Sequence, residues 1–184
     1  MLDGITVGGH KLDDQQVAVN QGNAWHYLFK SVKSDDFSFT KPFVCDLHSL
    51  AAKEEALEWG QFRSGMVTIA GSSYMPPTAG ELEKNFDELV VSSEQITDIY
   101  DKGIHAFLQM ARNQFFDDVN ERTGRLMMNG ILLNAGYPAL NLPAKRKLEF
   151  NEKMMRFYDS NDENEMNQFM RSCIDPRVVK IMCE

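Results

Sequence analysis

The sequence predicts a mainly α-helical fold, a helical bundle that carries one short β-hairpin. Apolar residues recur at helical spacing along most of the 184 residues. Helix-capping sequences precede several of these stretches, and the segment 61–77 alternates in the manner of strands. Because neither an internal repeat nor a low-complexity linker divides the chain, we expect one compact domain, with an N-terminal helical segment (1–38) and a core (39–184).

The composition restricts the class of protein. Nineteen basic and twenty-seven acidic residues give a net charge of −8, which argues against a protein that holds DNA through its phosphates. The three cysteines show no C-x-x-C spacing, and the N-terminus lacks the basic and apolar regions of a signal peptide. No run approaches the roughly 20 apolar residues that span a bilayer. We therefore expect an acidic cytoplasmic protein that binds neither DNA nor a membrane.

The first two helices are predicted from an apolar stripe and a cap. The stripe runs from residue 12 to about residue 31. Thr40 then supplies an N-cap, and Pro42 lies in the first turn of a second helix. Apolar residues continue this second helix as far as Leu57.

Two capping boxes predict the next two helices. Residues 78–81 have the S/T-x-x-E/Q pattern and precede an apolar face that begins at Leu82. Residues 92–95 have the same pattern and precede a long stripe that reaches Ala111. This stripe is wide enough for a central, largely buried helix.

The remaining helices follow from start and stop signals. A helix over about 120–135 ends at Gly136, a residue that favours a helix C-terminus. Pro143 opens another helix, and residue 160 or 161 caps a last one through Met170. Most of the eleven methionines fall at core spacing, so we interpret them as packing residues.

The segment 61–77 interrupts the helical pattern. It alternates small, polar and β-branched residues and ends at a double proline, which predicts a β-hairpin. Two roles remain open for it. It is either an ordered loop or an edge that pairs with an extended peptide, and the spacing alone favours the loop.

The stretch 114–125 carries most of the candidate chemistry. It leads into a helix, and the unpaired N–H groups of a helix N-terminus favour an anion. Arg122 and Arg125 share one helix face and suit phosphate oxygens, while Asp118 suits the Mg²⁺ that accompanies phosphate. In the alternative, Asp117 and Asp118 cap the helix and the arginines pair with surface carboxylates. The residues alone favour this alternative.

The same stretch resembles the signature of the Fic family, His-Pro-Phe-x-Asp/Glu-Gly-Asn-Gly-Arg-x-x-Arg. The matching residues are Phe116, Asp118, Asn120, Arg122 and Arg125. The segment 60–77 resembles the flap hairpin of that family, and 133–138 resembles the segment that follows the signature. The resemblance covers about 39–144 and implies a Fic fold.

Members of the Fic family transfer AMP from ATP to a hydroxyl group of a target protein. The resemblance implies that Asp118 binds Mg²⁺ and that Asn120 and the loop amides hold the α-phosphate of ATP. It implies that Arg122 and Arg125 clamp the outer phosphates and that Thr123 and Gly124 also belong to the nucleotide site. It also implies that flap residues hold the target protein by strand addition, namely Arg63, Met66, Val67, Thr68 and Ile69.

Three residues depart from the signature. Gln114 replaces the histidine that serves as general base, and an amide cannot take a proton, so we expect impaired transfer. Val119 and Glu121 replace glycines, which would strain the loop where φ is positive. Glu121 also adds negative charge near the phosphates. His105 lies nine residues before Gln114 on the same helix, about 13 Å away, and cannot replace the base.

Many Fic proteins carry an inhibitory helix with a Ser/Thr-x-x-x-Glu-Gly/Asn motif. Two segments resemble it weakly: residues 2–4, and residues 17–23, where Gln21 replaces the glutamate. Two functions follow from the resemblance. The first is an impaired AMP transferase, and the alternative is a non-catalytic Fic-fold protein that binds a nucleotide or a protein. The residues do not decide between a monomer and a homo-oligomer.

Overall fold

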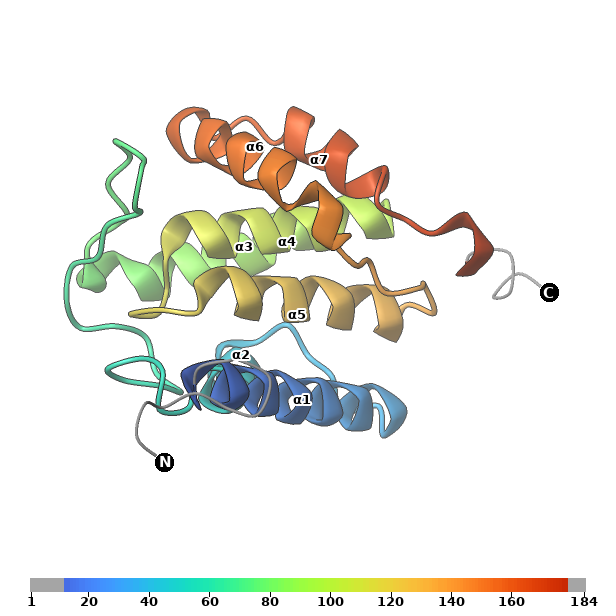
Figure 1. Cartoon of the computed structure of the whole chain (residues 1–184), viewed down its shortest axis with the longest axis horizontal. Helices are drawn as coiled ribbons and strands as arrows, with labels where there is room; N and C mark the ends of the chain where they lie inside the picture. The colour runs from blue at the N-terminus through green and yellow to red at the C-terminus, as the bar shows by residue number, and fades with distance from the viewer. Residues whose placement is uncertain (1–11, 179–184) are drawn as a thin grey trace.

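A computed structural model describes residues 12–178, which form α-helices and short 3₁₀ helices in three layers (Figure 1). The first layer comprises α1 (Leu12–Lys33) and α2 (Lys41–Ala51). The middle layer comprises α3 (Leu82–Glu94), α4 (Ile99–Asn113) and α5 (Asn120–Asn134), and the third comprises α6 (Lys147–Ser160) and α7 (Asn164–Arg171). The 3₁₀ helices η1 (Ala79–Glu81) and η2 (Ala144–Arg146) lead into α3 and α6. The predicted mainly α-helical fold is confirmed.

Helix α5 divides the hydrophobic core in two. Leu126 and Met127 pack with α1, α2 and α3 on one side. Met128 and Leu132 pack with α4, α6 and α7 on the other. Because both cores depend on α5, the N-terminus of this helix is held from two directions.

Glycine allows α5 to approach its neighbours closely. A Cβ atom at Gly130 would lie 2.2 Å from the ring of Phe37 and 2.9 Å from Leu28 of α1. A Cβ atom at Gly124 would lie 3.1 Å from the carbonyl oxygen of Phe107 in α4. The spacing of the first and middle layers therefore depends on the missing side chain of Gly130.

Three predicted helix boundaries are wrong. Helix α2 ends at Ala51, and Leu57 lies beyond it with 91% of its surface exposed. Helix α4 starts at Ile99, because Asp98 caps it by accepting a hydrogen bond from the Asp101 amide at 3.0 Å. The residues 92–94 instead complete α3. Asn161 does not cap α7 but ends α6 in the left-handed conformation, at φ 58°.

The predicted β-hairpin is also wrong, since residues 12–178 contain no β-strand. The flap (residues 61–77) is an extended loop that protrudes beside the helical layers (Figure 1). It turns over 69–72, where the Ser72 amide donates to the Ile69 carbonyl at 3.1 Å and Gly71 has φ 86°. An isolated pair of strands is marginally stable in water. The flap is held by side-chain bonds at its base instead.

Candidate nucleotide site

The signature loop (residues 114–119) joins α4 to α5, and residues at both of its ends have left-handed backbone. Gln114 ends α4 at φ 49°, and Val119 precedes α5 at φ 61° and ψ 16°. This conformation is an outlier for a β-branched residue. Glu121 lies in the first turn of α5, so only one of the two replaced glycine positions has positive φ.

Asn120 gives the signature loop its shape. Its side chain is 5% exposed, and its Oδ1 accepts a hydrogen bond from the Phe116 amide at 2.9 Å. Its Nδ2 donates to the Phe116 carbonyl at 2.8 Å and to Oε1 of Gln114 at 3.0 Å. Gln114 in turn donates from Nε2 to the Ala111 carbonyl at 2.6 Å. Both amide side chains are therefore used within the loop.

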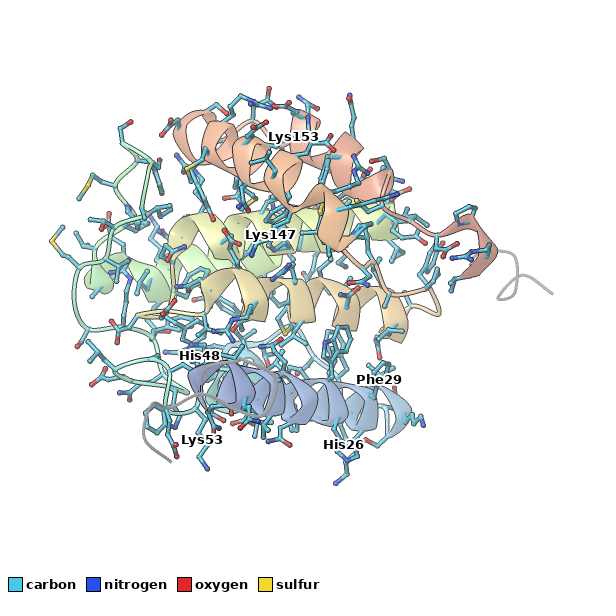
Figure 2. All side chains as sticks on the ribbon, viewed as in Figure 1. His26, Phe29, His48, Lys53, Lys147 and Lys153 are labelled. Atoms are coloured by element: carbon cyan, nitrogen blue, oxygen red, sulfur yellow. The ribbon has the colours of Figure 1, made fainter. Side chains whose placement is uncertain are left out.

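His48 of α2 is a buried support of this loop, and no local pattern in the sequence indicated a partner for it (Figure 2). Its ring stacks on Phe116 with 3.7 Å between centroids. Its Nδ1 accepts from the Gly60 amide at 3.1 Å, so Nε2 carries the proton and donates to the Asp118 carbonyl at 3.2 Å. Burial lowers the pKa of His48 to about 4 and keeps the ring neutral at pH 7. These partners lie 12 and 70 residues away in sequence.

The N-terminus of α5 offers unpaired backbone donors. The Thr123 amide donates to the Val119 carbonyl at 3.0 Å and is the first N–H bonded within the helix. The N–H groups at positions 120–122 have no intrahelical partner, and the helix dipole adds positive potential there. Together they favour an anion. Thr123 is 0% exposed and Gly124 packs on Phe107, so both shape the helix from inside.

A cavity of about 310 Å³ lies over this helix end; we call it the signature cavity. The signature loop, the start of α5, the flap tip and α6 all contribute to its lining: Thr68, Ile69, Ala70, Gln114, Asp118, Val119, Asn120, Glu121, Arg122 and Tyr158. The structure thus brings Gln114, Asp118, Asn120 and Arg122 together with the flap tip.

Asp118 is the carboxylate of this cavity that suits a metal ion. It is exposed, and its Oδ1 accepts from the Val119 amide at 2.6 Å. Among the described residues, no three His, Cys, Asp or Glu side chains are grouped to hold a metal. One carboxylate fits Mg²⁺ that takes its other ligands from phosphate oxygens and water.

Arg122 is paired within the chain. Its guanidinium forms an ion pair with Glu55, in which one N–O distance is 3.3 Å. Asn20 of α1 donates to the same carboxylate at 2.8 Å. Burial raises the pKa of Glu55, but the hydrogen bonds and charge of its partners outweigh burial and lower it overall. Helix α1 therefore reaches the edge of the signature cavity through Glu55.

Arg125 does not border the signature cavity. It lines a second cavity of about 480 Å³ between α1, α5 and residues 139–142, and only Arg122 borders both cavities. Burial and the charge of Arg122 lower the pKa of Arg125. Gln21 lines this second cavity, and its buried Nε2 has no hydrogen-bond partner among residues 12–178. The weak inhibitory motif over 17–23 thus lies on α1 beside Arg125, while residues 2–4 lie outside the described residues.

Glu121 and Tyr158 form a contact across the signature cavity. The Tyr158 hydroxyl donates to Glu121 at 2.8 Å. Burial, followed by the charge of Glu121, raises the pKa of Tyr158. Tyr158 was missed in the sequence because it lies 37 residues from Glu121, in a helix whose apolar pattern indicates only packing.

Arg63 anchors the base of the flap. It is 2% exposed, and its guanidinium donates to the carbonyls of Gln114 at 2.6 Å, Gly65 at 2.6 Å and Pro77 at 2.5 Å. Its amide donates to the Phe115 carbonyl at 2.9 Å. The other predicted flap residues differ in exposure, since Met66 and Thr68 are exposed while Val67 and Ile69 are half-buried.

The sequence model of the Fic/DOC family matches residues 38–132. The chain belongs to this family. The Fic match includes the signature loop, the flap and most of α5.

Relatives and solved structures agree with this assignment. A protein named protein adenylyltransferase Fic from Drosophila erecta is 26% identical over 176 residues, which cover 93% of this chain and 34% of the relative. The chain thus spans about a third of the length of the curated relatives that it matches.

Two solved structures share the fold. A Fic-1 fragment from C. elegans has a TM-score of 0.79 at 17% identity, over 94% of this chain and 52% of that chain. A Fic family protein from Desulfovibrio desulfuricans G20 has a TM-score of 0.70 at 20% identity, over 94% of this chain and 54% of that chain.

The predicted Fic residues fall into three groups in this structure. Some line the signature cavity, some are buried in support of it, and the rest do neither: Met66 and Val67 lie on the flap outside the cavity lining, and Arg125 lines the second cavity. Within the described part of the chain, no helix has the length and apolar character needed to cross a membrane.

Proposed function

We propose that the chain is a Fic adenylyltransferase of low activity, which transfers AMP from Mg²⁺–ATP to a hydroxyl group of a target protein. One observation carries the proposal: the free amides of α5, the Asp118 carboxylate and Arg122 border one cavity beside the flap tip. The name of the Drosophila relatives supports this type of reaction. The nucleotide, the metal and the target are parts of the proposal.

Each group would act on a different part of the substrate. The amides of α5 stabilise the charge that develops on the α-phosphate, and Arg122 binds the outer phosphates. Asp118 supplies a carboxylate ligand for Mg²⁺. The target oxygen bonds to the α-phosphorus as the bond to the β-phosphate oxygen breaks, and pyrophosphate leaves.

Gln114 limits the rate of this transfer. Its amide can orient the incoming hydroxyl but cannot accept its proton, which therefore passes to solvent. General-base help is worth about a hundred- to ten-thousand-fold. Its amide is also bonded to Ala111 and Asn120, so it must exchange a bond to contact the target.

Transfer of labelled AMP tests the proposal directly. The chain is incubated with α-labelled ATP, Mg²⁺ and cell lysate, beside the variants Gln114→His and Arg122→Ala. We expect weak labelling by the parent chain, labelling at least a hundredfold stronger with Gln114→His, and none with Arg122→Ala. No labelling by either the parent or Gln114→His would reject the proposed reaction.

A non-catalytic binding protein is the second candidate. Two contacts favour it, because they give side chains of the site partners within the chain. Glu55 pairs with Arg122, and Tyr158 donates a hydrogen bond to Glu121. It predicts that a partner protein is retained by the flap without label transfer, and that Thr68→Pro abolishes retention. Turnover above background would reject this candidate.

A further inference from the structure

A second group of reactive side chains lies where α3, α4 and the turn before α7 meet. His105 of α4 is central, because its Nε2 lies 3.0 Å from Oγ of Ser92 and its Nδ1 lies 2.8 Å from a carboxylate oxygen of Glu163. A hydroxyl, an imidazole and a carboxylate linked in this order form the arrangement that activates a serine nucleophile.

The surroundings of His105 fix which nitrogen carries the proton. A carboxylate only accepts hydrogen bonds, so the neutral ring that fits this geometry carries its proton on Nδ1 and turns the lone pair of Nε2 towards the hydroxyl of Ser92. Gln109 holds the carboxylate in place by donating to Glu163 at 2.6 Å. The side chains of His105 and Glu163 are 17% and 24% exposed, which shields the pair and still leaves it within reach of a ligand.

Ser92 and His105 border a cavity of about 450 Å³ that shares no lining residue with the signature cavity or the second cavity. Arg112 lies in the same cavity, on the α4 face that carries His105. Its guanidinium stacks 3.7 Å from the centre of the Tyr74 ring, and its Nε donates to the Tyr158 carbonyl at 3.1 Å. Within residues 12–178 Arg112 has no ion pair, so its terminal N–H groups suit an acidic group on a ligand.

The position of Ser92 within α3 restricts the chemistry. The backbone N–H groups around it belong to the helix, so no backbone oxyanion hole adjoins its Oγ. Its single hydroxyl proton is shared between two acceptors, since it donates to the Leu89 carbonyl at 3.0 Å and must leave that bond to turn towards His105. Such a site acts on acyl groups with a good leaving group, not on amides.

We propose that Ser92, His105 and Glu163 form an acyl-transfer site for activated esters that carry an acidic group. Oγ of Ser92 bonds to the ester carbonyl carbon while its proton passes to Nε2 of His105. The bond from that carbon to the leaving oxygen then breaks, and the leaving alcohol takes this proton. Water then attacks the carbonyl carbon of the acyl-serine and passes its proton to Nε2 of His105. The bond from that carbon to Oγ breaks and Oγ takes the proton, which releases a carboxylic acid and restores the hydroxyl. Arg112 pairs with the acidic group.

The probe is 4-acetoxy-3-nitrobenzoate, an acidic aryl ester that releases a coloured phenolate. The full chain is incubated with it, and acetylated peptides are located by mass spectrometry. We expect acetyl on the peptide that contains Ser92, and phenolate release at least tenfold slower in Ser92→Ala and His105→Gln. Arg112→Gln is expected to slow this ester but not the neutral 4-nitrophenyl acetate.

Two matched variants control for unrelated effects. Ser93→Ala changes the adjacent serine, which is buried, and His26→Gln changes a histidine that points away from the helical layers (Figure 2). Both are expected to react like the parent chain. Acetyl found only on other residues of the parent, or unchanged release by Ser92→Ala and His105→Gln, would overturn the proposal. The site of acetylation in the parent gives this answer even where a variant fails to fold.

Discussion

Val119 combines a backbone conformation that suits glycine with a buried side chain. Its φ of 61° disfavours a β-branched residue, while its side chain is 4% exposed and packs in the core beside α1 and α2. The packing therefore holds the backbone in a strained conformation. Its carbonyl accepts the first hydrogen bond of α5, so the strain lies at the start of the proposed anion site.

Truncation of Val119 to alanine or to glycine separates strain from packing. Both variants lose the side-chain packing, but only glycine adopts positive φ without steric cost. We expect Val119→Gly to be more stable than Val119→Ala by about 1 kcal/mol. The measurement is the free energy of unfolding in urea.

Val91 provides the control for this comparison. It lies in α3 and is 58% exposed, so helix propensity alone sets the order there. We expect Val91→Ala to be more stable than Val91→Gly by about 1 kcal/mol. If the alanine variant were more stable than the glycine variant at both positions, Val119 would carry no strain.

If Arg122 binds phosphate as proposed, its partner Glu55 competes with that phosphate. Replacement by glutamine keeps the size of the side chain but removes the charge that holds the guanidinium. We expect Glu55→Gln to bind Mg²⁺–ATP about tenfold more tightly and to lose about 1 kcal/mol of stability. Titration calorimetry measures the affinity. Glu165→Gln, which breaks exposed pairs with Arg156 and Lys153 far from the site, is expected to leave the affinity unchanged, and unchanged affinity in Glu55→Gln would contradict the assigned competition.

At the scale of elements, the contact of α5 with α1 depends on Gly130. A methyl group there would overlap Phe37 and Leu28, whereas a methyl group at Gly22 of α1 would meet nothing within 4 Å. We expect Gly130→Ala to lose about 1–2 kcal/mol through overpacking. Gly22→Ala is expected to gain up to about 1 kcal/mol from helix propensity. Thermal denaturation measures both, and stabilisation of both variants would show that the layers can separate freely.

The flap has the alternating pattern of a β-hairpin but forms a loop, and the contacts of Arg63 explain the difference. Its alternation of polar and β-branched residues suits a ribbon, but Arg63 directs the carbonyls of Gly65 and Pro77 towards its own guanidinium. Those carbonyls then have a partner at the base of the flap without any strand pairing. Ile69 packs against the core near α6, which fixes the tip separately.

For the whole molecule, stability depends on the neutral state of His48. Its pKa is about 4 in the folded protein, compared with about 6.5 for an unfolded chain. Between these values the unfolded state binds more protons, so stability falls as the pH is lowered from 6.5 to 4. We expect this ring to account for a loss of about 3 kcal/mol over that interval. Urea unfolding at a series of pH values measures it.

Glutamine at position 48 is the matched variant. Its amide can accept from Gly60 and donate to Asp118 as the imidazole does, but it does not titrate. We expect His48→Gln to be less stable at pH 7, because the stack on Phe116 is lost, and to have a flatter pH profile. Equal slopes in both proteins between pH 4 and 6.5 would contradict the role of His48.

The sequence predicted the helices and the signature loop because their signals are local. The capping box at Thr78 forms as predicted, with Glu81 bonded to the Thr78 amide at 2.8 Å. The partners of Arg122, Glu121 and His48 could not be predicted, since each contact joins segments that only the folded chain brings together. Arg122 and Arg125 both line the second cavity, as their shared helix face suggests, but only Arg122 also reaches the signature cavity, which helical spacing does not reveal.

The bonds of Arg63 fasten the base of the flap to the carbonyls of Gln114 and Phe115. Any displacement of the flap by a docked polypeptide must therefore be shared with the loop in which we propose the phosphate site. Thermodynamic linkage then requires reciprocity: if nucleotide raises the affinity for the polypeptide by some factor, the polypeptide raises the affinity for nucleotide by the same factor. The two proposed ligands would then be recognised as a pair, in whichever order they arrive.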